Sequence, residues 1–348
     1  MLIAFFINDF EREHSGYTTT VLAHQAALRG HRVCYMTPDD FVLRPDDSLH
    51  AHARFLPKRK YKDCKDFFDT LQSARAKVEA DDLGEVDVLV LRNDPSLDAG
   101  STPWAAEAGI LFGREAAKRG VLVLNDPDSL GHAVNKLYFQ SFPAEARAET
   151  LISRNEDDIK AFASQHKGNI ILKPLQGSGG QGVFKLDSKT KSNINQMIEA
   201  IGRDGYIIAQ AYVPAAKKGD IRLFLMNGRP LCVGDKYAAL RRVASPDDIR
   251  SNIHAGGTAE AVEIGDTELK VAEIIRPKLV ADGMFLVGID IVGDKVLEVN
   301  VFSPGNLKSC SDLAGVDFSV PILESIERKV QIASDYALRF DNRQLAVL

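Results

Sequence analysis

Short, almost uninterrupted apolar runs alternate with longer mixed segments over the first 125 residues. Apolar runs of this length, bounded by polar residues, predict strands that are buried on both faces. Strands that alternate with helices predict a parallel sheet covered on both sides, which is an α/β domain. The predicted strands are 2–7, 32–36, 86–91 and 121–125, and the predicted helices are 18–28, 66–79 and 102–118.

The pattern changes after residue 125, where apolar strands follow one another across short turn sequences. Asn227-Gly228-Arg229-Pro230 and Gly293-Asp294 are such turns, and each predicts a hairpin. Hairpins interleaved with helices predict antiparallel sheet, so we expect an α+β unit here. The predicted strands are 169–173, 182–186, 206–212, 221–226, 231–237, 285–292 and 295–301, and the predicted helices are 130–139, 157–165, 194–202, 269–281 and 321–336.

Composition narrows the class of protein without identifying it. The chain has 348 residues, of which 45% are hydrophobic and 26% charged, as in ordinary globular proteins. Its net charge of −5 argues against a dedicated nucleic-acid binder. Four scattered cysteines form no C-x-x-C pair, which indicates a reducing compartment and no zinc site. Without a basic leader or a long apolar run, we expect a cytoplasmic protein with no membrane segment.

A glycine-rich loop at 177–182 is the first candidate for chemistry. Gly177, Gly179 and Gly182 satisfy G-x-G-x-x-G, but a strand follows them where a Rossmann fingerprint requires a helix. No H-R-D or D-F-G sequence follows, so the loop does not belong to a protein kinase. With Lys173 on the preceding strand, backbone N–H groups and an ammonium group can cover a polyphosphate. A plain surface loop is the alternative.

Three polar residues interrupt the apolar strands of the last predicted hairpin. Glu298 and Asn300 are two positions apart, so they share a face of the sheet. Asp290 joins that face if the turn comprises Gly293–Lys295, which places Asp290 opposite Glu298. Two carboxylates and an amide oxygen form a site suited to Mg²⁺. The alternative is an ordinary solvent-facing sheet, although burying two like charges without a cation is costly.

The motifs taken together resemble the ATP-grasp superfamily, and specifically the prokaryotic glutathione synthetase family. The resemblance extends from the strand at residue 2 to about residue 307, and the order of the motifs is more specific than any one of them. They are Lys136, 173–175, 177–182, 210–214, 219–222, Arg242, 250–252, 256–257 and 288–304. The resemblance implies a parallel-sheet domain over 1–125, an ATP-grasp small subdomain over 126–205, a large subdomain with metal hairpin and lid over 206–315, and a C-terminal helix and tail over 316–348.

The resemblance also implies a reaction. An ATP-dependent ligase of this kind phosphorylates the cysteinyl carboxylate of γ-glutamylcysteine, and glycine then attacks the acyl phosphate to give glutathione, ADP and phosphate. The implied cofactors are ATP and Mg²⁺, with two ions expected and Mn²⁺ able to substitute. The implied partners are a dipeptide acid and an amino acid, with no nucleic acid and no membrane. A homo-oligomer in the cytoplasm is implied as well.

Individual residues take roles from the same resemblance. The implied nucleotide-binding residues are Lys136, Lys173, Gly177, Gly179, Gly180, Gly182, Gln210, Ala211, Tyr212, Val213 and Asp220. Arg222, Arg242 and Asn252 would surround the transferred phosphoryl group and the peptide carboxylate. Asp290, Glu298 and Asn300 would bind the metal. Arg250, Gly256 and Gly257 in a mobile lid, together with Ser303, would contact substrate.

The chain departs from the family pattern at positions that concern the substrate. Ser15–Thr20 stands where the family has a lysine- and serine-containing stretch, and Phe302 stands where threonine is usual. Arg92–Pro95 retains most of an R-x-D-P element, and Asp317–Leu348 is longer than expected. Two alternatives therefore stay open: an ATP-grasp ligase for another acid and amine, or a non-catalytic ATP-binding protein.

Overall fold

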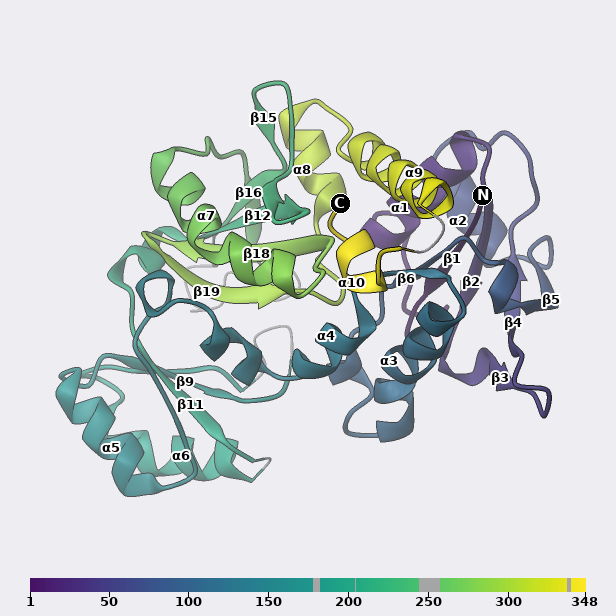
Figure 1. Ribbon diagram of the computed structural model, residues 1–348. Helices are drawn as coiled ribbons and strands as arrows, with labels where there is room; N and C mark the ends of the chain where they lie inside the picture. Colours follow the sequence, from purple (N-terminus) through teal and green to yellow (C-terminus); the bar gives the residue numbers. More distant parts are fainter. Residues whose placement is uncertain (178–181, 204, 244–256, 337–338) are drawn as a thin grey trace.

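The computed structural model describes residues 1–177, 182–203, 205–243, 257–336 and 339–348. Three sheets of seven, four and six strands organise the described chain, and a separate pair of short strands accompanies them. Figure 1 shows the N-terminal sheet in purple and blue, the four-stranded sheet in a teal lobe (the small lobe) and the six-stranded sheet in a green lobe (the large lobe). The C-terminal helices, drawn in yellow, lie beside the N-terminal sheet and the large lobe.

The N-terminal sheet has a parallel half that the hydrophobic pattern predicts correctly. Strands β2 (Arg32–Met36), β1 (Leu2–Phe6), β6 (Val88–Leu91) and β7 (Leu122–Leu124) lie side by side in that order. Alternate side chains of these strands enter two separate cores. One core includes helix α3 (Pro103–Lys118) and the other helix α1 (Thr18–Leu28), so the sheet is covered on both sides as predicted.

Three antiparallel strands extend the sheet beyond β2, and the sequence pattern does not predict them. They are β3 (Phe41–Leu43), β4 (Leu49–Phe55) and β5 (Lys77–Asp82), with β4 pairing β2, β3 and β5. The predicted helix over 66–79 is wrong beyond residue 71, because helix α2 covers only Cys64–Leu71. β5 is a polar edge strand with exposed or half-exposed side chains, so no apolar alternation marks it.

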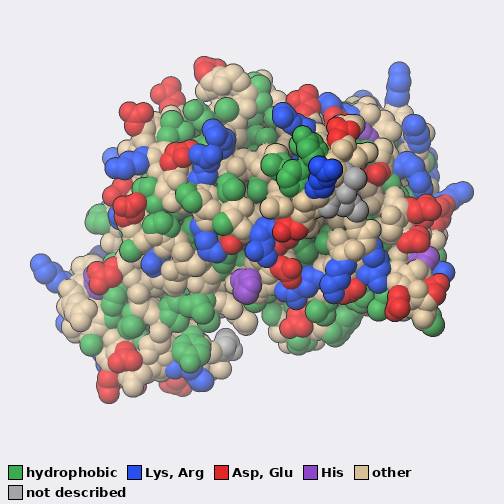
Figure 2. Space-filling view, viewed as in Figure 1, with side chains coloured by type: hydrophobic (Ala, Val, Ile, Leu, Met, Phe, Trp, Pro, Cys, Tyr) green, Lys and Arg blue, Asp and Glu red, His purple; other side chains and the backbone are tan. Residues whose placement is uncertain are grey.

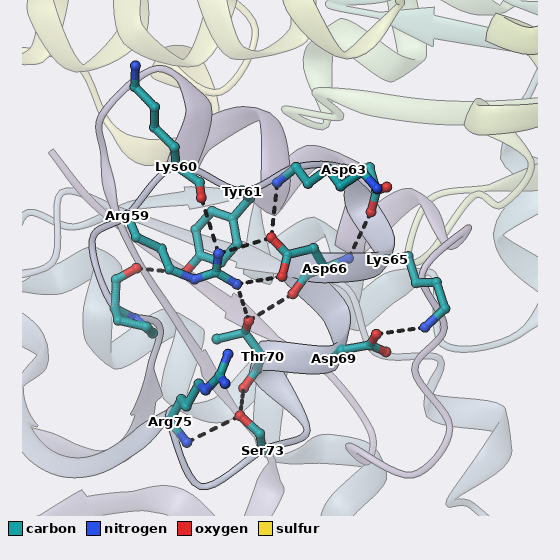
Figure 3. Close-up of polar contacts among 12 residues, drawn as sticks. Arg59, Lys60, Tyr61, Asp63, Lys65, Asp66, Asp69, Thr70, Ser73 and Arg75 are labelled. Atoms are coloured by element: carbon teal, nitrogen blue, oxygen red, sulfur yellow. Dashed lines mark hydrogen bonds and ion pairs between the residues drawn. The ribbon is translucent and has the colours of Figure 1, made fainter.

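A polar network fixes the chain where it enters α2 (Figure 3). Arg59 donates to both carboxylate oxygens of Asp66 at 3.0 and 2.6 Å and to the Thr70 hydroxyl at 2.7 Å. Its guanidinium also lies over the Tyr61 ring, 4.3 Å from the centroid. The Asp63 carboxylate accepts from the Asp66 N–H at 2.8 Å, which is an N-cap and explains why the helix begins at residue 64.

The small lobe contains an antiparallel sheet with two helices on one side. Its order is β10 (Phe184–Leu186), β9 (Ile170–Pro174), β11 (Ile207–Ala211) and β8 (Thr150–Ser153). Helices α5 (Glu156–Gln165) and α6 (Ile194–Gly202) share a core with this sheet. The predicted helix over 130–139 is wrong as a single element. Helix α4 covers Pro127–His132, and a separate 3₁₀ helix, η4, covers Lys136–Ser141.

The large lobe is an antiparallel sheet beside helix α7 (Asp266–Ala281), which contributes to its core. Its order is β17 (Thr258–Glu260), β16 (Ala239–Val243), β12 (Asp220–Met226), β18 (Leu286–Val292) and β19 (Lys295–Asn300), with β13 (Arg229–Pro230) also on β12. The hairpin predicted at Asn227-Gly228 forms, but its second strand is interrupted. Residues 232–237 leave β12 as a small hairpin of β14 (Cys232–Val233) and β15 (Lys236–Tyr237), and pairing resumes at Ala239.

Helices α8 (Leu307–Ala314), α9 (Ser319–Asp335) and α10 (Asn342–Leu345) complete the chain. Helix α9 replaces the predicted helix over 321–336 with a shift of one or two residues at its ends. In α10, the Asn342 side chain accepts from the Val123 N–H at 2.7 Å and donates to the Val123 carbonyl at 3.0 Å. The C-terminal segment therefore binds the edge strand β7 of the N-terminal sheet.

The face seen in Figure 2 carries charged side chains of both signs. On the face seen in Figure 2, acidic and basic side chains lie close to one another, and neither sign covers a whole lobe. Among the described residues, no helix is both long and apolar enough to span a membrane.

Candidate active site

One face of the large-lobe sheet carries most of the polar residues that the sequence singles out. Strand pairing places Arg222 of β12 opposite Asp290 of β18, and Asp290 opposite Glu298 of β19. It also places Asp220 of β12 opposite Arg242 of β16. Because side chains alternate along a strand, these residues share a face, while the intervening apolar residues enter the core shared with α7. The fold thus brings together residues that are up to about 80 positions apart.

The Asp290–Glu298 pairing is confirmed, but the predicted turn is wrong. The loop has two residues, Gly293 and Asp294, because Val292 pairs with Lys295 rather than Val296. The register shifts next to Asp290, where a β-bulge adds one residue to β19. With a two-residue loop alone, Asp290 and Glu298 would point to opposite faces of the sheet. The extra residue of the bulge returns them to the same face. The bulged strand also exposes Leu297 to the cleft.

The four charged residues behind the cleft neutralise one another. Arg222 donates to the two Asp290 oxygens at 2.5 and 3.0 Å, and the Arg242 guanidinium lies 2.7 Å from Asp290. Arg242 also donates twice to Asp220, at 2.9 and 2.5 Å. All four side chains are buried. Burial raises the pKa of Asp290, but the two arginines outweigh it and hold that pKa at about 2.

Two lysines approach the cleft from the small lobe and the segment before it. Lys173 of β9 is half-buried, and desolvation lowers its pKa to about 8 although Glu298 acts to raise it. Its ammonium group donates to the Gln210 amide oxygen at 3.2 Å. Lys136 of η4 donates to the Gly177 carbonyl, and burial lowers its pKa as well. The charges of Glu298 and Asp94 act to raise the pKa of Lys136, but desolvation outweighs them.

The cleft lies between β19 and the segment after it in the large lobe and β9 and β11 of the small lobe, and residues 94–96 of the N-terminal domain line it as well. The predicted residues that line it are Lys136, Lys173, Gly177, Gln210, Glu298, Asn300 and Ser303. Asp220, Arg222, Arg242 and Asp290 lie in the sheet behind this lining, while Gly182, Ala211, Tyr212, Val213 and Gly257 lie outside it. Gly179, Gly180, Arg250, Asn252 and Gly256 lie outside the described residues.

Several lining residues escape the sequence analysis. They are Asp94–Ser96 from the N-terminal domain, Ala133–Asn135 and Tyr138–Gln140 before the small lobe, and Ile208 of β11. The R-x-D-P element at 92–95 is the one sequence signal among them, and the sequence alone gives it no role. Residues contributed by a distant domain have no local pattern that connects them to the cleft.

The segment after β19 is held by the N-terminal domain. Asn125 donates to the Val301 carbonyl at 2.5 Å, and Arg92 donates to the Pro304 carbonyl at 3.0 Å. Both donors are buried and follow directly on parallel strands of the N-terminal sheet. Ser303 lies between the two bound carbonyls and reaches the cleft. The position of this lining segment is therefore set by the N-terminal domain.

Two of the three predicted ligands, Glu298 and Asn300, line the cleft and fit a magnesium ion, whereas both carboxylate oxygens of Asp290 accept from arginines. The Glu298 carboxylate accepts no hydrogen bond within the described residues and lines the cleft beside Asn300. The Asn300 amide donates to Asp290 at 3.4 Å, so the three predicted ligands are neighbours. Oxygen donors of this kind bind Mg²⁺ together with substrate phosphates. No cluster of three or more His, Cys, Asp or Glu side chains that suits a metal occurs in the described part of the chain.

Comparison with known proteins identifies the family. The family model of the prokaryotic glutathione synthetase N-terminal domain matches residues 1–131, and that of the ATP-grasp domain of prokaryotic glutathione synthetase matches residues 135–315. The chain belongs to the prokaryotic glutathione synthetase family. It is an ATP-grasp ligase of the glutathione synthetase type, and the predicted fold class is confirmed. The ATP-grasp fold binds ATP with Mg²⁺.

Relatives named glutathione synthetase match most of the chain. The glutathione synthetase of Agrobacterium fabrum is 33% identical over 317 residues, which cover 90% of this chain and 92% of that protein. The glutathione synthetase of Vibrio parahaemolyticus is 34% identical over 252 residues, covering 72% of this chain and 76% of that protein. This similarity supports the family and the type of reaction.

Solved structures of other ATP-grasp enzymes share the fold at low identity. The ligase PsnB in complex with a minimal precursor, Mg and ADP has a TM-score of 0.58 at 18% identity, covering 94% of this chain and 98% of that chain. The D-cycloserine synthetase DcsG has a TM-score of 0.58 at 14% identity, covering 93% and 99% of the two chains. At such identities the likeness concerns the architecture alone.

Proposed function

We propose that this protein catalyses ATP-dependent glutathione synthesis from γ-glutamylcysteine and glycine. The observation that carries the proposal is the opposition of charges across the cleft. Lys136 and Lys173 lie on one side, and Glu298 and Asn300 lie on the other. A triphosphate with its metal needs cations for its oxygens and oxygen ligands for the ion, which is this arrangement. Family membership supports the choice of substrates.

The chain's own residues perform a reaction that depends on positioning and charge. Lys136 and Lys173 would bind the phosphate oxygens, and the ion held by Glu298, Asn300 and Asp290 would neutralise charge on the transferred phosphoryl group. Arg222 and Arg242 hold Asp290 ionised and fixed in direction. Phosphoryl transfer to a carboxylate requires no protein nucleophile, because the acid itself attacks.

The amine step takes place at the acyl phosphate that the first step forms. The nitrogen attacks the acyl carbon, the carbon–oxygen bond to phosphate breaks, and inorganic phosphate leaves with the electron pair of that bond. Exclusion of water protects the acyl phosphate from hydrolysis in the meantime. We propose that residues 250–257, with Ser303 on the cleft wall, contact the substrates during this step.

A second function is favoured by one observation. Phe302 is among the residues that line the cleft, directly beside Ser303, although its side chain also packs against the hydrophobic core. A ligase that joins a different acid to a different amine would use the same nucleotide site but would have a different residue at this position of the substrate site. The Ser15–Thr20 stretch is a second departure of the same kind.

The direct test is the release of phosphate and ADP. The purified protein is incubated with Mg-ATP, γ-glutamylcysteine and glycine, and each substrate is omitted in turn. We expect release that depends on both the acid and the amine, with glutathione identified by mass spectrometry. Folded protein that releases phosphate only with another acid–amine pair would establish the second function instead. Nucleotide binding without turnover on any pair would leave a non-catalytic protein.

We also propose that the protein works in the cytoplasm as a homo-oligomer and binds two Mg²⁺ ions, which Mn²⁺ can replace. The four cysteines are free thiols, as expected in a reducing compartment. Sedimentation measures the oligomeric state, and titration of metal in the presence of ADP counts the ions. A monomeric protein would contradict the proposed homo-oligomer, and a single bound ion would contradict the proposed pair of Mg²⁺ ions.

A further inference from the structure

The R-x-D-P element, Arg92–Pro95, lies where β6 ends, at the carboxyl edge of the parallel strands. In α/β sheets, this edge is where ligands bind. Arg92 turns away from the cleft surface, because it is 5% exposed and donates to the main chain of the segment after β19. Asp94 does the opposite and lines the cleft together with Pro95 and Ser96. The element thus has a buried structural residue and a carboxylate available to a ligand.

The Asp94 carboxylate is fixed on a rigid support. The Asn8 side chain accepts from the Asp94 N–H at 2.7 Å and donates to the Asp94 carbonyl at 2.9 Å. One carboxylate oxygen accepts from the Ser96 N–H at 3.0 Å and from the Ser96 hydroxyl at 2.7 Å. The other oxygen has no hydrogen-bond partner in the described residues. Asp94 is half-buried, so its carboxylate has little bound water for a ligand to displace. A ligand that reaches it can therefore form a directed, charge-assisted hydrogen bond.

The position of Asp94 in the cleft suggests what that ligand is. The reacting carboxylate of the acid must lie near the phosphates, and therefore near Lys136 and Lys173. The rest of the acid must extend toward another wall, and the N-terminal domain supplies the wall that contains Asp94. A fixed carboxylate with an open oxygen binds a cation with hydrogen atoms to donate. An ammonium group on the acid meets this requirement.

We propose that Asp94 binds the ammonium group of the acid substrate and thereby selects acids that carry one. The proposal rests on the proposed function in assuming an acid with the chemistry of a γ-glutamyl peptide. Asp94 is a binding and specificity-determining residue in this scheme. It would contact a part of the acid that does not react, so its removal raises KM for the acid more than it lowers kcat. The Asp94 charge also acts on Lys136, so the affinity for ATP is measured for each variant as well.

The test compares two acids that differ only in the ammonium group, γ-glutamylcysteine and its desamino counterpart glutarylcysteine. ADP release is measured with wild type, Asp94→Asn and Asp94→Ser, where serine keeps an oxygen for the Ser96 N–H. We expect wild type to prefer the ammonium-bearing acid about 10- to 100-fold in kcat/KM, because a hydrogen bond to a charged group contributes about 1.5–3 kcal/mol. Both variants should lose this preference, through a raised KM for γ-glutamylcysteine alone.

Asp98→Asn is the matched control. Asp98 lies on the same loop and is buried, and it accepts from the Asn8 side chain at 2.5 Å, but it does not line the cleft. We expect this variant to retain the wild-type preference to within about twofold, even if its thermal stability falls. Thermal unfolding of each variant with ATP bound shows that the compared proteins are folded.

The outcomes separate this proposal from the proposed function. In one outcome, wild type uses γ-glutamylcysteine, and both Asp94→Asn and Asp94→Ser still prefer it over the desamino acid. This outcome overturns the role of Asp94 and leaves the proposed function intact. An equal loss of kcat with both acids overturns that role too, and indicates that Asp94 accepts a proton from the incoming amine. If wild type does not use γ-glutamylcysteine, the function fails. The comparison is then made with the acid that supports turnover, and an accepted acid without an ammonium group contradicts the proposal.

Discussion

Charged side chains on the two sides of the cleft differ in whether they contact an opposite charge. In the large lobe, two arginines and two aspartates form a closed set in which each charge contacts an opposite one. Around the small lobe, Lys173 and Lys136 are half-buried, and their hydrogen-bond partners within the described residues are neutral oxygens. The pKa of Asp290 is lowered to about 2, which favours its charged form, whereas the pKa of Lys173 is lowered to about 8, which disfavours its charged form.

This difference indicates which parts are complete before substrate arrives. The arginine–aspartate set stabilises itself, so it can hold Asp290 in one direction without a ligand. The lysines are destabilised by lost hydration until an anion approaches, and a triphosphate supplies that anion. Binding energy from the nucleotide is therefore largest at the lysines. The fixed geometry needed for phosphoryl transfer comes from the sheet.

The largest effect is expected from Asp290→Asn, which breaks the closed set. Turnover should fall roughly 100- to 1,000-fold, because a charge that stabilises the transferred group is lost. The free energy of unfolding should fall by about 3 kcal/mol, since two buried arginines lose their shared partner. Nucleotide affinity should change much less. Steady-state ADP release, chemical denaturation and a nucleotide titration measure the three quantities.

Asp294→Asn is the control for that experiment, because Asp294 is in the turn of the same hairpin with its side chain 72% exposed. It should change stability by less than about 0.5 kcal/mol. An Asp290→Asn protein that turns over at the wild-type rate would remove the metal assignment and the comparison with it.

An intermediate effect is expected from Lys173→Ala. The dissociation constant for ATP should rise about 10- to 100-fold, because a charge-assisted contact to phosphate is lost. The free energy of unfolding should stay equal or increase, because a desolvated cation has been removed. Isothermal titration and denaturation measure these. Lys160→Ala on the outer helix α5 is the control. It should change the dissociation constant for ATP by less than about twofold and the free energy of unfolding by less than about 0.5 kcal/mol. A Lys173→Ala protein that binds ATP normally would contradict the role of this wall.

A smaller effect is expected from pH. Because the pKa of Lys173 is about 8 in the free protein, its cation disappears as the pH rises through that value. ATP affinity should therefore decrease above about pH 8, by up to about tenfold per unit. Lys173→Arg should flatten this dependence, because arginine stays charged. A flat profile for wild type would show that Lys173 is charged throughout.

The same group should affect stability with a defined sign. Between about pH 8 and 10.5, Lys173 is neutral in the folded protein and protonated in the unfolded chain. The unfolded state then binds more protons, so the free energy of unfolding rises with pH across this window. Subtracting the profile of Lys173→Ala removes the contribution of other groups. A difference that falls with pH would contradict the lowered pKa.

The sequence alone was sufficient for the elements with strong patterns and for the chemistry-bearing residues on them. Apolar runs predicted the parallel strands, and polar interruptions in an apolar hairpin identified Asp290, Glu298 and Asn300. The sequence led to the pairing of Asp290 with Glu298 only through a three-residue turn, whereas the structure forms it with a two-residue turn and a bulge. These features are local, because a strand reveals its buried face through its own residues.

Only the tertiary structure decided how distant segments meet. The bulge in β19, the excursion at 232–237 and the polar edge strand β5 follow from pairing with other strands, which no local pattern records. The two arginines around Asp290 and the carboxylate of Asp94 in the cleft depend on contacts between segments far apart in sequence. Periodicity describes which face of an element is buried, whereas the partner on that face is chosen by packing of the whole chain.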